Sequence, residues 1–144
     1  MTLQVKEISS DQAKAHAFGI RMRVFVSEQG VPAEIELDVD DHHAIHFLAT
    51  TSGRSVGTAR LVMQGKEAKI GRMAILKKYR RRGIGAALLK SVIAAAKRRG
   101  ARIIFLHAQI TVIEFYEKMG FRCVGPVFDE AGIAHRQMIL MKRK

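Results

Sequence analysis

YRRRGIGAALL, residues 79–89, is a basic loop with two glycines one residue apart that leads into an amphipathic run. Glycine has no Cβ atom, so a ligand can approach the backbone closely at Gly83 and Gly85. The first N–H groups of a helix lack partners within the helix, and the helix dipole adds partial positive charge there. Lys77 and Lys78 add two cations to the three arginines of the loop. The stretch therefore predicts a pyrophosphate cradle at the start of a helix.

The bulk composition limits what this chain can be. Its 144 residues are 48% hydrophobic and carry a formal net charge of +12. That length and hydrophobic share fit a single domain, residues 1–144, with a core of its own. The excess of cations indicates a polyanionic partner, which could be nucleic acid, an acidic membrane or a phosphorylated cofactor.

Cysteine usage and the lack of targeting signals favour the cytoplasm. Cys123 is the only cysteine, so no internal disulfide can form, and we expect it to serve packing. We find no secretory signal in the sequence. The longest apolar stretches, such as residues 103–106, are too short to span a bilayer. A cytoplasmic protein is therefore expected.

Hydrophobic periodicity and turn signals predict interleaved strands and helices. Residues 26–43 have no period and carry many acids, so we expect a long loop of the kind that often covers a binding site. The order β-α-β-β-β-α-β-α-β-β predicts an α/β (α+β) sheet covered by helices. The expected strands are 3–8, 44–51, 55–63, 68–76, 102–108, 124–128 and 133–141, and the expected helices are 11–25, the run from the glycine loop to 98, and 113–119.

The glycine motif does not match two common phosphate-binding loops. A dinucleotide-binding fold needs a third glycine three residues after Gly85, where Leu88 stands. A P-loop needs Gly-Lys-Ser/Thr, which is absent. The pattern Arg80-x-x-Gly83-x-Gly85 resembles instead the Q/R-x-x-G-x-G/A acetyl-CoA loop of the GNAT N-acetyltransferases.

Two further segments carry the same resemblance. FYEKMGF, residues 115–121, is similar to the A-x-x-F-Y-E-K-x-G-F helix of that family and follows the glycine loop at the expected distance. RMRVFVSEQ, residues 21–29, is similar to the R-x-x-VFV-x-EQ signature of the ElaA-like subgroup. The specific motifs of the loop and the helix cover residues 72–121, and the element order agrees with the family along the rest of the chain.

The resemblance implies a GNAT-type acyl-CoA N-acyltransferase fold, a mixed and mostly antiparallel sheet flanked by helices. It also implies transfer of the acetyl group of acetyl-CoA to a primary amine of a small molecule or protein, by direct attack and without a metal. Gln109 stands where many members carry an Asn that binds the pantetheine arm, and Lys69 stands where some carry a general-base Glu. The residues implied to bind acetyl-CoA are Met73, Ala74, Ile75, Arg80, Arg81, Arg82, Gly83, Ile84, Gly85, Ala86 and Gln109.

Three residues are candidates for catalysis. The resemblance implies that Tyr116 is the general acid that protonates the leaving thiolate, although it could be a core aromatic beside Phe115. It also implies that strand splaying leaves a backbone N–H near Ala74 to polarise the thioester carbonyl. His107 lies near the end of a predicted buried strand, where it could relay the proton of the amine, as water could, or be a satisfied core histidine.

The acceptor amine and any metal are harder to place. The acidic 26–46 region suggests capture of a cationic amine, with Glu28, Gln29 and His46 as substrate contacts, although it could be a plain polar loop. Several histidines and aspartates cluster nearby. In a strand, His42 and His46 would share a face and His43 would not, and no cysteine assists, so we expect turn caps or a substrate rim and no metal site. These residues are His42, His43, Asp38, Asp40 and Asp41.

Two other functions stay open on the residues alone. The net charge would suit a basic nucleic-acid-binding module, but no binding motif is present and aromatic residues for base stacking are scarce. A non-catalytic acyl-CoA sensor could have kept the cradle without the chemistry. We expect no specific nucleic-acid partner and no membrane partner, and a homodimer is compatible with the sequence.

Overall fold

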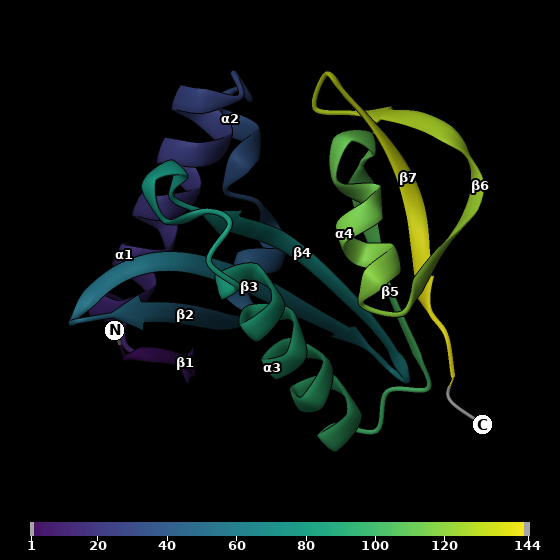
Figure 1. Cartoon of the computed structure of the whole chain (residues 1–144), viewed down its shortest axis with the longest axis horizontal. Coiled ribbons are helices and arrows are strands. Elements are labelled where there is room, and N and C mark those ends of the chain that lie inside the picture. Colours follow the sequence, from purple (N-terminus) through teal and green to yellow (C-terminus); the bar gives the residue numbers. More distant parts are fainter. Residues whose placement is uncertain (1, 143–144) are drawn as a thin grey trace.

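Seven strands form one mixed sheet in the computed structural model, which describes residues 2–142 (Figure 1). Their order across the sheet is β1-β2-β3-β4-β5-β7-β6. Within it β4 and β5 run parallel and the other neighbours run antiparallel, which confirms the predicted sheet type. The strands are β1 (Leu3–Ile8), β2 (Ile45–Thr51), β3 (Arg54–Gln64), β4 (Glu67–Ile75), β5 (Ile103–Gln109), β6 (Phe121–Glu130) and β7 (Ile133–Leu140).

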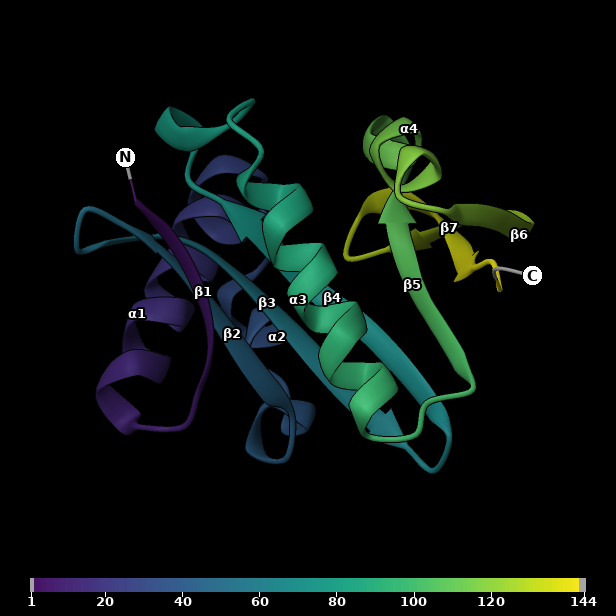
Figure 2. The same ribbon diagram turned by 60° about the horizontal axis from the view of Figure 1, so that its bottom comes forward.

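Helices cover both faces of the sheet (Figure 2). Successive residues of β2 point to opposite faces, so Phe47 and Ala49 join the core under α3, whereas Leu48 packs with Ala17 and Ile20 of α1. No helix within residues 2–142 is long and apolar enough to cross a membrane. The helical segments are α1 (Asp11–Arg21), η1 (Met22–Glu28), α2 (Ala33–Glu36), η2 (Val39–His42), η3 (Lys77–Tyr79), α3 (Ile84–Arg98), η4 (Ile110–Val112) and α4 (Ile113–Lys118).

The parallel strands β4 and β5 diverge half-way along their length (Figure 1). Their pairing runs from Glu67 opposite Ile103 to Ile70 opposite Leu106. From Gly71 onward, no residue of β4 pairs with β5 within the described chain. The two strands therefore open a V between them, with backbone along its sides.

A β-bulge at Arg72 adds to this irregularity. The register between β3 and β4 shifts between Thr58 and Arg60, and Arg72 has a φ of 49°. A left-handed conformation in a non-glycine residue costs about 1–3 kcal/mol. The Arg72 guanidinium lies 3.1 Å from the Glu36 carboxylate and 3.0 Å from that of Asp38, and these ion pairs help to hold the strained residue in place.

The helix predicted over residues 11–25 changes pitch part-way. Its α-helical part, α1, ends at Arg21, and the chain continues as the π-helix η1. The wider turn shows in the bond from the Gln29 N–H to the Val24 carbonyl, five residues back. Residues 26–43, predicted as a loop, hold the end of η1, α2 and η2, so that prediction is wrong in part. Such π-helical turns are frequent at functional sites.

The last hairpin is longer than predicted. β6 extends over Phe121–Glu130, whereas the sequence indicates residues 124–128. Gly125, with a φ of 78°, and the following Pro126 look like strand breakers in the sequence. In the structure they lie in an irregular stretch between Val124 and Phe128, and the strand resumes its pairing with β7 beyond it.

Candidate active site

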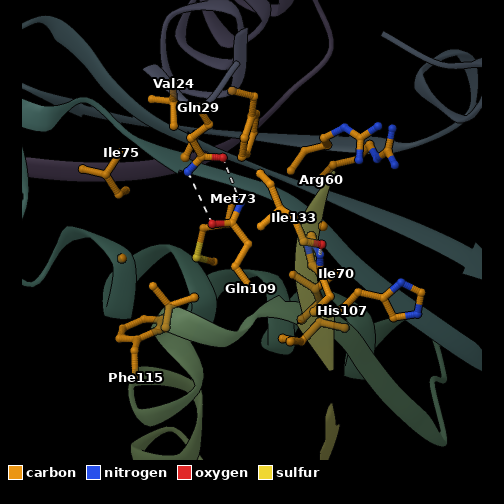
Figure 3. A pocket seen from close by; sticks show the side chains of 18 of the residues that line it. Val24, Gln29, Arg60, Ile70, Met73, Ile75, His107, Gln109, Phe115 and Ile133 are labelled. Atoms are coloured by element: carbon orange, nitrogen blue, oxygen red, sulfur yellow. Dashed lines mark hydrogen bonds between the residues drawn. The ribbon is translucent and has the colours of Figure 1, made fainter. Parts of the chain in front are cut away.

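A cleft of about 1040 Å³ opens where β4 and β5 diverge (Figure 3). Its walls come from the ends of both strands, the start of α3, the helix α4 and the turn between β6 and β7. Most residues predicted to bind acetyl-CoA or to act on it line this one cleft. They are Met73, Ala74, Ile75, Arg80, Arg81, Gly83, Ile84, Gly85, Ala86, His107, Gln109 and Tyr116, together with the predicted substrate contact Gln29.

The glycine loop leaves the start of α3 open. Gly83 is the N-cap residue, with a φ of 80° that favours glycine, and no side chain caps the helix. A Cβ on Gly85 would lie 3.4 Å from Cζ of Phe115, so any side chain there would project into a tight space. Arg82 is not part of the cleft wall, since its guanidinium lies over the ring of Tyr79 at 5.7 Å. The backbone N–H groups of the first turn are thus free to face an anion.

Arg80 and Glu28 form an ion pair that ties the glycine loop to η1. Two guanidinium nitrogens of Arg80 lie 2.6 and 2.9 Å from the two oxygens of Glu28, and Nε donates to the Ile75 carbonyl at 2.9 Å. The hydrogen bonds from Arg80 lower the pKa of Glu28. Glu28 lies outside the cleft wall and is already paired, so we withdraw it as a direct contact for a cationic amine.

Gln29 and Gln109 join their side chains across the cleft (Figure 3). The Gln109 amide donates to Oε1 of Gln29 at 2.8 Å, and a longer bond of 3.4 Å runs the other way. The two residues are 80 positions apart in sequence. Because both line the cleft, Gln109 lies where a pantetheine amide could replace Gln29 as its partner.

Tyr116 lies half-buried on α4, with its hydroxyl 3.8 Å from Sδ of Met73. Its ring packs edge-to-face against Phe115, with the centroids 5.0 Å apart. Burial raises the pKa of Tyr116 to about 12, so the phenol keeps its proton at neutral pH. The hydroxyl therefore presents a hydrogen-bond donor beside the end of β4.

His107 and Glu130 form a second polar pair in the cleft. Nδ1 of His107 lies 3.0 Å from Oε1 of Glu130, a residue at the end of β6. The hydrogen bond from His107 lowers the pKa of Glu130 to about 2. Sequence reasoning singled out His107 but missed Glu130, which lies in the connection between the predicted strands 124–128 and 133–141.

The structure does not bring His46 into the cleft. Its side chain is 1% exposed, packs edge-to-face on Phe18 and places Nε2 3.1 Å from the Asp41 carbonyl. Burial lowers its pKa, which favours the neutral ring. His46 supports η2, and we withdraw it as a substrate contact. Within residues 2–142, no group of three His, Cys, Asp or Glu side chains could hold a metal ion.

A buried network of charges fixes the acidic segment to the sheet. Arg21, 1% exposed, contacts the Glu36 carboxylate at 2.7 Å and that of Asp41 at 2.8 Å. Arg60 pairs with Asp38 at 2.6 Å and with Asp41 at 3.2 Å. Sequence reasoning missed this network, although Arg21 opens the RMRVFVSEQ signature.

Burial and pairing act in opposite directions on these carboxyl groups. Burial raises the pKa of Glu36 despite its arginine neighbours. Burial alone would also raise the pKa of Asp41, but hydrogen bonds from Arg21 and Arg60 lower it to about 2. Asp41 is thus ionised at neutral pH, and its buried charge depends on Arg21 and Arg60 for compensation.

Comparisons with known proteins match one family over most of the chain. The family model described as "Acetyltransferase (GNAT) domain" matches residues 5–142. The uncharacterized N-acetyltransferase YjcF of Bacillus subtilis is 37% identical over 124 residues, 85% of this chain and 89% of that protein.

Solved structures share the fold. An acyl-CoA N-acyltransferase from Pseudomonas aeruginosa superposes with a TM-score of 0.84 at 26% identity, covering 97% of this chain and 99% of that one. Escherichia coli ElaA superposes with a TM-score of 0.87 at 23% identity, covering 97% and 100%. The second likeness concerns the fold alone.

Proposed function

This chain belongs to the GNAT acetyltransferase family, and from that premise we propose that it transfers the acetyl group of acetyl-CoA to a primary amine of a small molecule or protein. The observation that carries the proposal is the uncapped start of α3, which opens into the cleft where β4 and β5 diverge. The same cleft is lined by the end of β4, which has no β5 partner, and by Tyr116, whose phenol is protonated at neutral pH.

The residues present fit acetyl-CoA. Backbone N–H groups from Gly83 to Ala86 would hold the pyrophosphate, helped by the dipole of α3. The edge of β4 over Met73, Ala74 and Ile75 has no β5 partner and would pair with the amides of the pantetheine arm. Gln109 would contact the same arm. When bound, acetyl-CoA supplies the activated acetyl group, and the chain supplies its position.

Two groups of the chain would act on the reacting atoms. A backbone N–H near Ala74 would polarise the thioester carbonyl as negative charge develops on its oxygen. Tyr116 would face the sulfur. A thiol of the cysteine kind has a pKa of about 8.5, well below that of this phenol, so Tyr116 stabilises the leaving thiolate mainly by a strong hydrogen bond.

The acceptor would enter from the side of η1 and the β6–β7 turn. Gln29 lines the cleft there and remains a substrate contact in this proposal. Lys69 also lines the cleft. It stands where some members of the family carry a glutamate that acts as the general base. A protonated lysine cannot accept the proton of the amine, so that role belongs to another group.

Gly85→Val is expected to abolish stabilisation by acetyl-CoA. At about a hundred times its dissociation constant, the ligand should add roughly 2.7 kcal/mol to the stability of the parent protein. The valine side chain would fill the space beside Phe115 and keep the pyrophosphate from the backbone. Thermal unfolding with and without acetyl-CoA measures the effect.

Gly19→Val is the matched control, because Gly19 lies in α1 and a Cβ atom added there would meet nothing within 4 Å. Its shift with acetyl-CoA should equal that of the parent. A full shift in Gly85→Val would place acetyl-CoA elsewhere. Duplex DNA in place of acetyl-CoA tests the nucleic-acid alternative and should produce no comparable shift.

A further inference from the structure

We propose that His107 accepts the proton of the attacking amine and that Glu130 positions it by fixing its tautomer. This inference rests on the proposed acetyl transfer and adds the base that the sequence left open. His107 is the catalytic residue of the pair, because its free ring nitrogen is available to the substrate. Glu130 acts through His107 and is a positioning residue.

The hydrogen-bond chemistry assigns the tautomer. Oε1 of Glu130 lies 3.0 Å from Nδ1 of His107. An ionised carboxylate only accepts hydrogen bonds, so Nδ1 carries the hydrogen in this contact. Nε2 of a neutral ring is then a bare lone pair, and none of the described side chains or backbone groups bonds to it. A carboxylate that orients a histidine base in this way is a recurrent catalytic arrangement.

Aromatic packing holds the ring of His107 in place. Phe128 meets it edge-to-face at 5.0 Å between centroids, and Phe105 lies 6.1 Å away. Phe105 and His107 are two residues apart on β5, so both point to the same face of the sheet. The side chain of His107 remains 22% exposed, which leaves a route for the proton to solvent.

The register of the sheet explains why the base lies on β5. Lys69 pairs with Phe105 across the parallel strands, so Lys69 and His107 share a face and both line the cleft. A general base at the position of Lys69 on β4 would therefore lie on the same side of the cleft as His107. In this chain Lys69 occupies that position, and His107 follows its partner Phe105 by two residues on β5.

Two other titratable groups face the pair. His135 on β7 has Nε2 3.8 Å from Glu130, but its Nδ1 lies 2.7 Å from the Ile133 carbonyl and donates to it. The Nε2 atom of His135 is thus beyond hydrogen-bond distance of Glu130, so the short hydrogen bond of this carboxylate is the one to His107. The Lys69 charge lowers the pKa of Glu130 and helps to keep it ionised.

The transfer step replaces the carbon–sulfur bond of the acetyl group by a carbon–nitrogen bond and moves one proton to His107. The amine nitrogen forms a bond to the acetyl carbon, and the bond from that carbon to sulfur breaks with its electron pair on sulfur. Nε2 of His107 takes the proton that the nitrogen loses, and Glu130 stabilises the resulting imidazolium. The thiolate leaves with the hydrogen bond from Tyr116, and the imidazolium returns its proton to solvent.

Glu130→Gln is the decisive variant, and Asp129→Asn is its control on the neighbouring residue, which is exposed and outside the cleft. The glutamine amide can donate to Nδ1 and so move the hydrogen to Nε2. We expect kcat to fall about 100-fold in Glu130→Gln, the lower end of a general-base contribution, with KM for acetyl-CoA unchanged. Asp129→Asn should match the parent in both.

These rates are measured as CoA release with spermidine, lysine, a lysine peptide or an aminoglycoside, whichever the parent accepts. A Glu130→Gln protein with the parent kcat overturns the inference but leaves acetyl transfer standing. Nitrogen-15 NMR of the histidines tests the tautomer without any acceptor. Hydrogen on Nδ1 of His107 supports the inference, and hydrogen on Nε2 overturns it even if no amine is turned over.

Discussion

Tyr116→Phe is expected to lower the turnover of acetyl-CoA with an accepted amine by at least about 100-fold. The substitution keeps the ring and its packing on Phe115 and removes only the hydroxyl that lies beside Met73. A single hydrogen-bond donor aimed at developing negative charge contributes roughly 10²–10³ in rate. The affinity for acetyl-CoA should change little, because the hydroxyl matters mainly as the thiolate forms.

Tyr79→Phe makes the same chemical change at the other tyrosine and serves as the control. The Tyr79 ring, over which Arg82 lies, is retained, so turnover should stay near that of the parent. Steady-state rates and acetyl-CoA binding are measured on all three proteins. If Tyr116→Phe keeps the parent rate, the thiolate is stabilised by water or by another residue, and the assignment of Tyr116 is wrong.

Arg21→Leu is expected to reduce the free energy of unfolding by about 3–5 kcal/mol. Removing one partner of a buried ion pair leaves the other charge without compensation. Here Glu36 and Asp41 would both lose the cation that lies 2.7 and 2.8 Å from them. Urea unfolding near neutral pH measures the loss.

Arg99→Leu provides a matched comparison at the surface. Arg99 pairs with Glu7, and both side chains are partly exposed. Exposed ion pairs contribute about 0–1 kcal/mol, so this variant should unfold nearly as the parent does. Equal losses in the two variants would contradict the view that the network around Arg21 holds the acidic segment.

Local patterns in the chain were enough to predict most of the fold. The amphipathic run from the glycine loop to residue 98 predicts α3, and the predicted strands 44–51 and 55–63 correspond to β2 and β3. These features depend on residues close in sequence. The π-helix η1 was not predicted, because Ile20 and Val24 continue the helical spacing of α1 and π-helical turns are rare.

The candidate site shows the same division. The anion loop and the helix with Tyr116 were predicted from short motifs. The partners of individual side chains were not, because they lie far apart in sequence: 52 positions separate Arg80 from Glu28, and 23 separate Glu130 from His107. His46 was misplaced because strand alternation tells which residues share a face, but not that α1 covers that face.

Release of free CoA from acetyl-CoA, measured across a panel of primary amines with mass analysis of the products, tests the central claim most directly. The account predicts that at least one amine gains an acetyl group as CoA appears, and that Gly85→Val abolishes both signals. A protein that binds acetyl-CoA at the glycine loop but acetylates no amine in the panel would contradict the proposed catalysis. That result would favour a non-catalytic acyl-CoA sensor.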